Sequence, residues 1–171
     1  MVVLILIVNQ LYAQEVFRDS YDKEADFRYI VTTKTDFDTD YLVKCRITYT
    51  STGELETFRL DVNTEEEESI LYNHASNTLF LIFKDGEKLK LIRNNKRDSF
   101  GDYKVSFYMF SDKAQSEVEQ NYYLEKITTS DLDGFEFVSI RDKKEYKVKE
   151  FNKDLLKRHV ESIKNALEKS E

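Results

Sequence analysis

The sequence predicts an α+β protein dominated by antiparallel strands, roughly seven to nine of them in one sheet or two packed sheets, with a C-terminal amphipathic helix on one face. Three observations lead to this prediction. Apolar residues recur at every second position in short segments along most of the chain, turn residues separate these segments, and only the last segment carries apolar residues at helical spacing. With four Gly, no Pro and one Cys, the composition excludes collagen-like sequence and an intramolecular disulfide framework.

Two hairpins are predicted in the first half of the chain. Residues 43–49 and 58–62 alternate between apolar and polar side chains, and Ser51, Thr52 and Gly53 turn the chain between them. Residues 79–83 are continuously apolar, which suggests a strand covered on both faces, and residues 88–92 alternate again. Between these two segments, Asp85 and Gly86 supply the positive φ angles of a tight hairpin turn.

Four further strands are expected at residues 103–110, 122–127, 135–140 and 145–151, with residues 128–134 as a short turn or a helical turn. Residues 94–102 and 111–120 are polar and are expected to be irregular. Thr64 and Glu67 have the spacing of a capping box, which is typical of a single helical turn or an acidic loop.

The C-terminal helix is predicted to begin at Asn152, whose side chain suits an N-cap. Phe151 precedes this cap and Leu156 is its fourth helical residue, which is the spacing of a hydrophobic staple. The helix carries one apolar stripe, formed by Leu155, Leu156, Val160, Ile163 and Leu167.

The first residues resemble a secretory signal peptide. Residues 2–8 are unbroken apolar sequence, which is too short for a membrane-spanning helix, and Ala13 suits the position before the cleavage site. The alternative is a buried first strand, because the run is rich in β-branched residues. We therefore divide the chain into a signal peptide with a truncated positive region at 1–13, an acidic segment at 14–41, and a single α+β domain at 42–171, and we expect a periplasmic or secreted protein with no membrane span after cleavage.

The charge balance argues against nucleic acid as a partner. Lys and Arg number 26 against 33 Asp and Glu, a net charge of −7, whereas binding to phosphate needs clustered cations.

Three segments together carry a resemblance to a known group of proteins: NTLFLIFKDGEKLKLI, NYYLEKITTSDLDGFEFVSIRD and KEYKVKEFNKDLLKRHVESIKNAL. They resemble small secreted, functionally uncharacterised proteins of Bacteroidetes-type bacteria, over about residues 42–167. The middle segment departs from the group's pattern, because only residues 128–134 stand where the group has a longer helical turn. The resemblance implies a fold and a compartment, and no reaction.

Asp36, Asp38 and Asp40 are the candidate metal ligands, because alternating carboxylates open many calcium loops. An EF-hand loop starting at Asp36 needs Gly where Tyr41 stands and Glu where Ile47 stands, so the match is weak. Ser130, Asp131 and Asp133 before Gly134 form a still weaker cluster of oxygen ligands. The prediction is that the protein holds no metal and no cofactor.

No catalytic residue is predicted. His74 and His159 are the only histidines, and neither has a second metal ligand at a suitable spacing. His159 is expected at the boundary of the helical stripe. Cys45 alternates with Val43 and Ile47 on what should be the inward face of a strand, where a thiol stays protonated and unreactive.

These observations favour a soluble extracytoplasmic protein that binds or interacts with an unknown protein, peptide or glycan. Exposed aromatic side chains can stack on sugar rings or receive a partner's side chains, and the chain has clusters of them at Tyr103, Phe107, Tyr108, Phe110, Tyr122 and Tyr123. The alternatives are a carboxylate-dependent hydrolase of glycans or peptides, and an accessory or inhibitor-like protein of an extracellular enzyme. A deep cleft with two convergent carboxylates would favour the hydrolase.

Overall fold

The computed structural model describes residues 16–37, 40, 43–64, 78–93, 105–109, 117–138 and 143–169. These residues form ten strands, two α-helices and one short 3-10 helix. The strands are β1 (Val16–Asp22), β2 (Phe27–Thr32), β3 (Thr35–Asp36), β4 (Val43–Thr52), β5 (Leu55–Thr64), β6 (Thr78–Phe83), β7 (Lys88–Arg93), β8 (Val105–Met109), β9 (Leu132–Val138) and β10 (Lys143–Lys147). The helices are α2 (Glu117–Thr129), η1 (Glu150–Asn152) and α3 (Leu155–Glu168).

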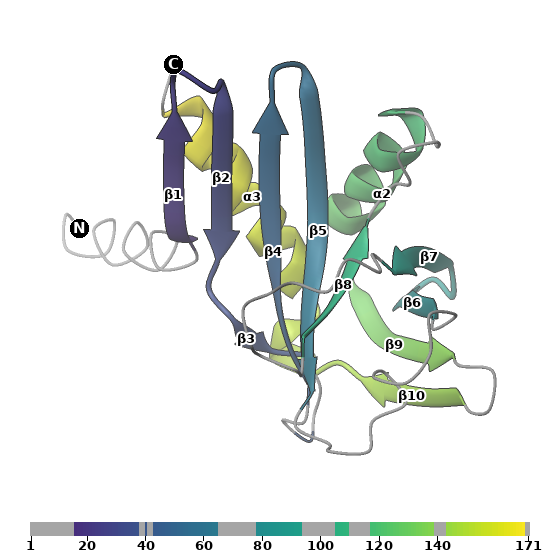
Figure 1. Ribbon diagram of the computed structural model, residues 1–171. Coiled ribbons are helices and arrows are strands. Elements are labelled where there is room, and N and C mark those ends of the chain that lie inside the picture. Colours follow the sequence, from purple (N-terminus) through teal and green to yellow (C-terminus); the bar gives the residue numbers. More distant parts are fainter. Residues whose placement is uncertain are drawn as a thin grey trace, which may run out of the picture.

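All strand pairs are antiparallel and follow the order β1-β2-β4-β5-β8-β7-β6-β9-β10, with β3 paired to β4 beside this series. The longest pairing joins β4 and β5, from Val43 opposite Thr64 to Thr52 opposite Leu55. The pairing of β7 with β8 covers only two residue pairs, Ile92 with Met109 and Arg93 with Tyr108. This short contact connects two halves of the sheet (Figure 1). We call them the N-terminal half, which contains β1, β2, β4, β5 and β8, and the C-terminal half, which contains β6, β7, β9 and β10.

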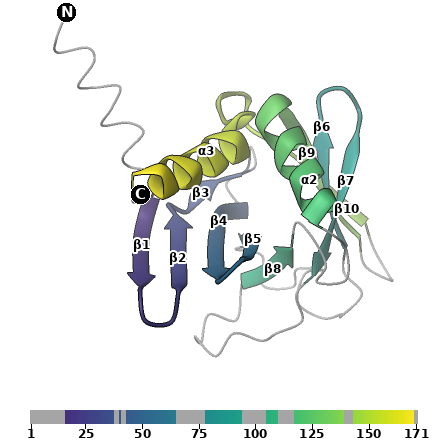
Figure 2. The ribbon, with the colours of Figure 1, turned by 90° about the horizontal axis from the view of Figure 1, so that it is seen from above.

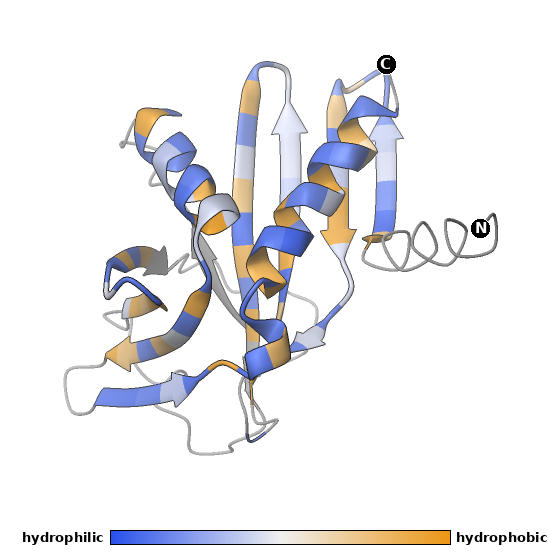
Figure 3. Ribbon diagram, turned by 180° about the vertical axis from the view of Figure 1, so that it is seen from behind, coloured by the Kyte–Doolittle hydropathy of each residue, from blue (hydrophilic) through white to orange (hydrophobic). Residues whose placement is uncertain are grey.

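Both long helices lie on the same side of the sheet (Figure 2). α3 packs across β1, β2 and β4, and α2 lies beside α3 near β6 and β7. In Figure 3, seen from the helix side, apolar and hydrophilic residues alternate along α3. No described helix covers the opposite face of the N-terminal half.

Aromatic side chains connect the two halves of the sheet in the core. Phe37, which follows β3, stacks on Phe135 of β9 with ring centroids 4.3 Å apart. Phe135 in turn stacks on Tyr146 of β10 at 5.1 Å, and Phe137 contacts both rings edge-on. Because Phe37, Phe135 and Phe137 are fully buried, this cluster makes one continuous core out of the two halves.

The predicted fold class is confirmed, since the described chain is mostly antiparallel sheet with a C-terminal helix. The acidic segment 14–41, for which no strand was predicted, contains β1, β2 and β3. The alternation of apolar and polar residues is weak in β1, because β1 is an edge strand with mostly exposed side chains and a bulge between Val16 and Arg18.

The strand predicted at residues 122–127 is wrong, because these residues lie inside helix α2. The buried residues of α2 are Gln120, Leu124 and Ile127, which is helical spacing. Two apolar side chains, Val118 and Tyr122, lie on the exposed side and Gln120 on the buried side. The apolar residues therefore surround the helix, and the helical period is weak in the sequence.

The C-terminal helix is confirmed, and its start needs correction. α3 begins at Leu155 with Asp154 as its N-cap, while Asn152 lies in η1 and is buried. The Asn152 side chain donates a hydrogen bond from Nδ2 to the carbonyl oxygen of Asp36 at 2.8 Å. This bond connects the segment that precedes α3 with β3. The predicted staple is absent, because Phe151 is 72% exposed.

Gly86 has the predicted positive φ, of 85°, and Asp85 does not. The Gly86 amide donates to the Phe83 carbonyl at 2.8 Å, which makes a type I turn followed by a glycine in the left-handed region. The loop is thus one residue longer than a two-residue turn. Strand β6 alternates between buried and half-buried residues, so one of its faces is fully covered and the other is covered only in part.

Several predictions lie wholly or partly outside the described residues. These are the signal peptide at 1–13, the capping box that ends at Glu67, the loop at 94–102 and most of the polar interval at 111–120. Within the part of the chain that the structure describes, no helix is long and apolar enough to cross a membrane.

Candidate functional site

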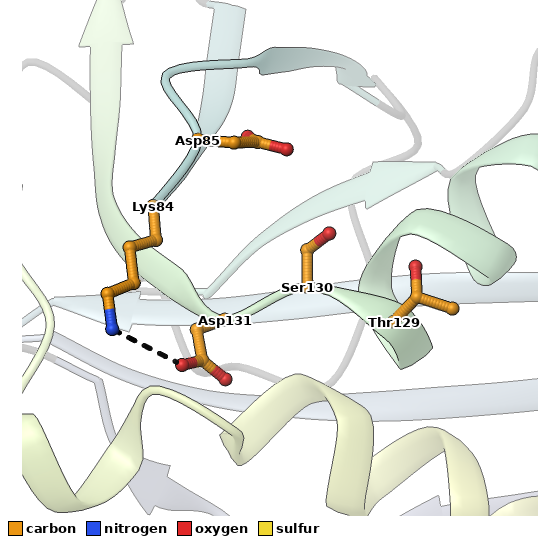
Figure 4. A pocket seen from close by; sticks show the side chains of 5 residues that line it. All are labelled: Lys84, Asp85, Thr129, Ser130 and Asp131. Atoms are coloured by element: carbon orange, nitrogen blue, oxygen red, sulfur yellow. Dashed lines mark ion pairs between the residues drawn. The ribbon is translucent and has the colours of Figure 1, made fainter.

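The surface has an open depression between the β6–β7 turn and the C-terminal end of α2. It is lined by Lys84, Asp85, Thr129, Ser130 and Asp131 and has a volume of about 410 Å³. Figure 4 shows that Lys84 points toward Asp131, while the Asp85 carboxylate points away from both. Because the depression is wide and shallow, a ligand there stays largely in contact with solvent.

Backbone hydrogen bonds hold the two walls of the depression together. The Lys84 amide donates to the Asp131 carbonyl at 3.0 Å, which links the β6–β7 turn to the segment after α2. The Ser130 amide donates to the Lys126 carbonyl at 3.0 Å, and this bond ends the helix at the edge of the depression. The position of the lining residues is therefore set by the backbone on both sides.

Lys126 of α2 is the centre of an ion-pair network next to the depression. Its Nζ lies 2.5 Å from Asp85 Oδ2 and 2.6 Å from Glu87 Oε2. The Tyr122 hydroxyl, one turn earlier on α2, donates to Glu87. The three side chains of Lys126, Glu87 and Tyr122 thus attach the helix to the β6–β7 turn. By contrast, Lys84 and Asp131 are both more than half exposed and 3.9 Å apart, so their ion pair is weak.

The carboxylates beside the depression are held in the ionised form. Hydrogen bonds from Lys126 are the main cause that lowers the pKa of both Asp85 and Glu87. The same contacts raise the pKa of Lys126, and the bond to Glu87 raises the pKa of Tyr122. A carboxyl group that serves as a general acid near neutral pH needs a raised pKa. The electrostatics of Asp85 and Glu87 therefore suit binding rather than acid catalysis.

Two other carboxylates are nearly buried on the sheet, and each lies between two cations. Asp61 of β5 contacts Arg46 at 3.1 Å and Arg59 at 2.6 Å, and also accepts a 2.8 Å hydrogen bond from Thr48. In the other half, Glu136 of β9 contacts Lys88 at 2.9 Å and Lys143 at 2.6 Å. The contacts of Asp61 join the neighbouring strands β4 and β5, and those of Glu136 join β9 to its neighbour β10 and, across β6, to β7. We interpret both as structural ion pairs, which compensate the cost of burying a charge.

Of the three calcium candidates, the structure describes Asp36 and Asp40. The Asp36 carboxylate pairs with Lys149 Nζ at 3.3 Å. Asp40 lies exposed in a turn, and Asp38 lies outside the described residues. Among the residues that are described, no group of three or more His, Cys, Asp and Glu side chains is placed to hold a metal ion.

The second oxygen cluster is partly at the depression. Ser130 and Asp131 line it, whereas Asp133 pairs with Lys153 at 3.5 Å. Gly134 lies inside β9 rather than at a turn. Sequence reasoning named Ser130 and Asp131 as possible cation ligands, but missed Lys84, Asp85 and Lys126 as their neighbours.

The remaining candidates lie in the core or outside the described residues. Cys45 is buried as predicted, and burial strongly raises the pKa of its thiol. His159 is fully buried rather than at a boundary, with only 1% of its surface exposed. His74 lies outside the described residues. Of the aromatic clusters, Tyr122 and Tyr123 lie on α2, and Tyr122 is about half exposed.

Comparison of the chain with known protein families, with curated proteins and with solved structures found no match.

Proposed function

We propose that the protein is a soluble binding protein that acts outside the cytoplasm and contacts a protein or peptide partner through α2 and the β6–β7 turn. We call this the α2 surface and define it by Lys84, Asp85, Val118, Tyr122 and Asp131. The observation that carries the proposal is the exposed Tyr122 ring, whose hydroxyl is fixed by Glu87 next to an open depression.

A tyrosine held in this way is a suitable contact residue. Tyr122 remains 48% exposed and Val118, one turn earlier on the same side of α2, is 74% exposed. Tyr and other aromatic residues contribute much of the energy at protein interfaces because they bury a large area and have few rotatable bonds. Since the bond to Glu87 already restricts the Tyr122 side chain, less conformational entropy is lost when a partner binds.

Charge favours a partner segment that carries basic side chains. Carboxylates outnumber lysines around the α2 surface, and those of Asp85 and Glu87 stay ionised well below neutral pH. Complementary charge across an interface raises the rate of association and selects the partner. The carboxylates are Glu117, Glu119, Glu125, Asp85, Glu87 and Asp131, and the lysines are Lys84 and Lys126.

The proposal is tested by capturing partners from the native extracytoplasmic fraction with three versions of the protein. The wild type and Tyr21→Ala are expected to capture the same partner, because Tyr21 is an exposed tyrosine of β1 on the other half of the sheet. Tyr122→Ala is expected to reduce capture at least tenfold, in the range of a strong interface residue. Equal capture by all three proteins would place the contact surface elsewhere.

A second measurement separates binding from catalysis. The wild type and Asp85→Asn are incubated with mixed peptide and oligosaccharide substrates, and products are detected by mass spectrometry. We expect no turnover. Turnover that is lost in Asp85→Asn would contradict the proposal and support the carboxylate-dependent hydrolase.

A further inference from the structure

His159 joins α3 to three strands through neutral partners. Its Nδ1 is hydrogen-bonded to the Thr32 hydroxyl of β2, and its Nε2 lies 3.5 Å from the Thr35 hydroxyl of β3. The Thr32 hydroxyl also accepts a 2.8 Å hydrogen bond from the backbone amide of Ile47 in β4. Since Thr32 and His159 are both almost completely buried, this network lies inside the interface between α3 and the sheet.

Among the residues that the structure describes, no hydrogen bond or ion pair joins the His159 ring to a carboxylate. Arg158, the next residue on α3, is cationic and pairs with Asp154 at 3.1 Å. Asp36, next to Thr35 on β3, pairs with Lys149, and Cys45, opposite Thr35 on β4, is a protonated thiol. At other points on the elements that pack against α3, Arg28 of β2 pairs with Asp19 of β1, and Lys126 of α2 pairs with Asp85 and Glu87.

An imidazolium ion in this position would be a buried charge whose described hydrogen-bond partners are hydroxyl groups only. Burial, and secondarily the charge of Arg158, lower the pKa of His159 to about 3. A histidine in water has a pKa of about 6.5. His159 is therefore neutral in the closed interface at pH 5 to 7, and takes up a proton in this range only when the ring reaches solvent.

We propose that His159 is an acid-sensitive latch, through which mild acid releases α3 from the sheet while the strands stay paired. The attachment of α3 is suited to separate release, because it depends on side-chain packing, on the His159 network and on a 2.9 Å hydrogen bond from Arg28 Nη2 to the Ala166 carbonyl, rather than on a strand ladder. Local opening of single elements below the free energy of global unfolding is common in proteins. Release would expose the apolar inner face of β2 and β4, including Ile30 and Ile47.

The direction of the pH effect follows from proton linkage. The closed state binds fewer protons than the open state between pH 3 and pH 6.5, so opening becomes more favourable as the pH falls through this range and is unaffected above it. For one histidine the opening constant rises about tenfold between pH 7.5 and pH 5.5.

The proposal is tested by hydrogen exchange of the full chain at pH 7.5 and pH 5.5, with the intrinsic pH dependence of exchange divided out. We expect the opening constant of α3 amides to rise about tenfold at pH 5.5 in the wild type. The amides of α2 and of β4, apart from that of Ile47, serve as internal controls and are expected to show no such rise. In His159→Asn, which can keep a hydrogen bond to Thr32 and does not titrate, the α3 opening constant is expected to be the same at both pH values.

Two results would overturn the latch. One is a rise of equal size in α3, α2 and β4, which would indicate global unfolding, and the other is the same rise in His159→Asn. If His159→Asn does not fold, the imidazole signals of His74→Gln, in which His159 is the only histidine, decide the question. A folded-state pKa near 6.5 would contradict the proposal, and no titration of the folded protein down to pH 5 would support it.

Discussion

Gly134 illustrates how closely two backbones approach at one residue of the sheet. It lies in β9 opposite Lys147 of β10, and a Cβ atom at this position would be 2.7 Å from the Tyr146 carbonyl oxygen. That distance is too short for a carbon–oxygen contact, and the backbone of β10 cannot rotate away as a side chain would. Position 134 therefore requires glycine because glycine has no Cβ atom. The backbone of Gly134 does not have a positive φ.

We predict that Gly134→Ala destabilises the protein by about 1–3 kcal/mol, because the added methyl group forces β9 and β10 apart. Lys147→Ala is the matched control, since Lys147 lies at the same point of the strand pair and its side chain is exposed. Chemical denaturation of the two variants and the wild type measures the difference. A free energy of unfolding of Gly134→Ala within 0.5 kcal/mol of the wild type, roughly the scatter of neutral surface substitutions, would show that β10 moves without cost.

At the scale of elements, α2 is held to the sheet by charged groups as well as by its core residues. Leu124 and Ile127 pack into the core, while Lys126 bonds to Asp85 and Glu87 of the β6–β7 turn. The Lys126 ammonium also lies over the Phe83 ring, 5.4 Å from its centroid. The helix and the turn therefore form one unit, and the depression at their junction depends on both.

Replacing Lys126 by Met tests this network. We predict that the pKa values of Asp85 and Glu87 rise toward those of ordinary carboxyl groups, because the hydrogen bonds that lower them are lost. A lowered carboxyl pKa stabilises the folded state at neutral pH, and this contribution disappears as the pH falls through the folded-state pKa. The Lys126→Met variant should thus lose less stability on acidification than the wild type.

Carbon-detected NMR titration of the carboxyl groups measures these pKa values directly. Lys84→Met is the control, because Lys84 pairs only weakly with Asp131 and its removal should leave the Asp85 pKa unchanged. Equal shifts of Asp85 in both variants would indicate a general field effect instead of a direct bond from Lys126.

At the scale of the whole molecule, the described fold starts at Val16, shortly after the predicted cleavage site. β1 begins the sheet, and its residue Val16 packs partly against the core.

We predict that the protein recovered from the extracytoplasmic fraction begins at Gln14. Intact-mass spectrometry measures this, and expression of a variant with Ala13→Arg should block cleavage, because signal peptidase requires a small residue at that position. Recovery of a chain that keeps residues 1–13 would mean that the apolar run is part of the fold, as a buried first strand.

Much of the architecture could be predicted from local sequence. The alternation of apolar and polar residues in β4, β5 and β7 and the apolar stripe of α3 extend over several residues. Each of these elements can therefore be predicted from its own sequence. The positive φ of Gly86 and the burial of Cys45 are also local consequences of turn chemistry and strand alternation. Where the pattern was broken by an edge, a bulge or a two-sided distribution of apolar residues, as in β1 and α2, the sequence was misleading.

The candidate site could be predicted only in fragments. Ser130 and Asp131 were named from their oxygens, and Tyr122 from its aromatic ring, but they were assigned to a cation loop and a strand. Lys126 and Asp85 are 41 positions apart in the chain, and no repeating pattern relates them. Their contact exists because α2 packs next to the β6–β7 turn.

The sequence by itself determined the fold class, most of the strands, the C-terminal helix and the buried position of Cys45, since hydrophobic periodicity and turn residues act over a few positions. The tertiary structure alone decided that residues 117–129 form a helix, that the acidic segment supplies three strands, and that His159 joins α3 to β2, β3 and β4. The physical reason is that burial and ion pairing at these places depend on neighbours far away in the chain, whose positions no local pattern contains.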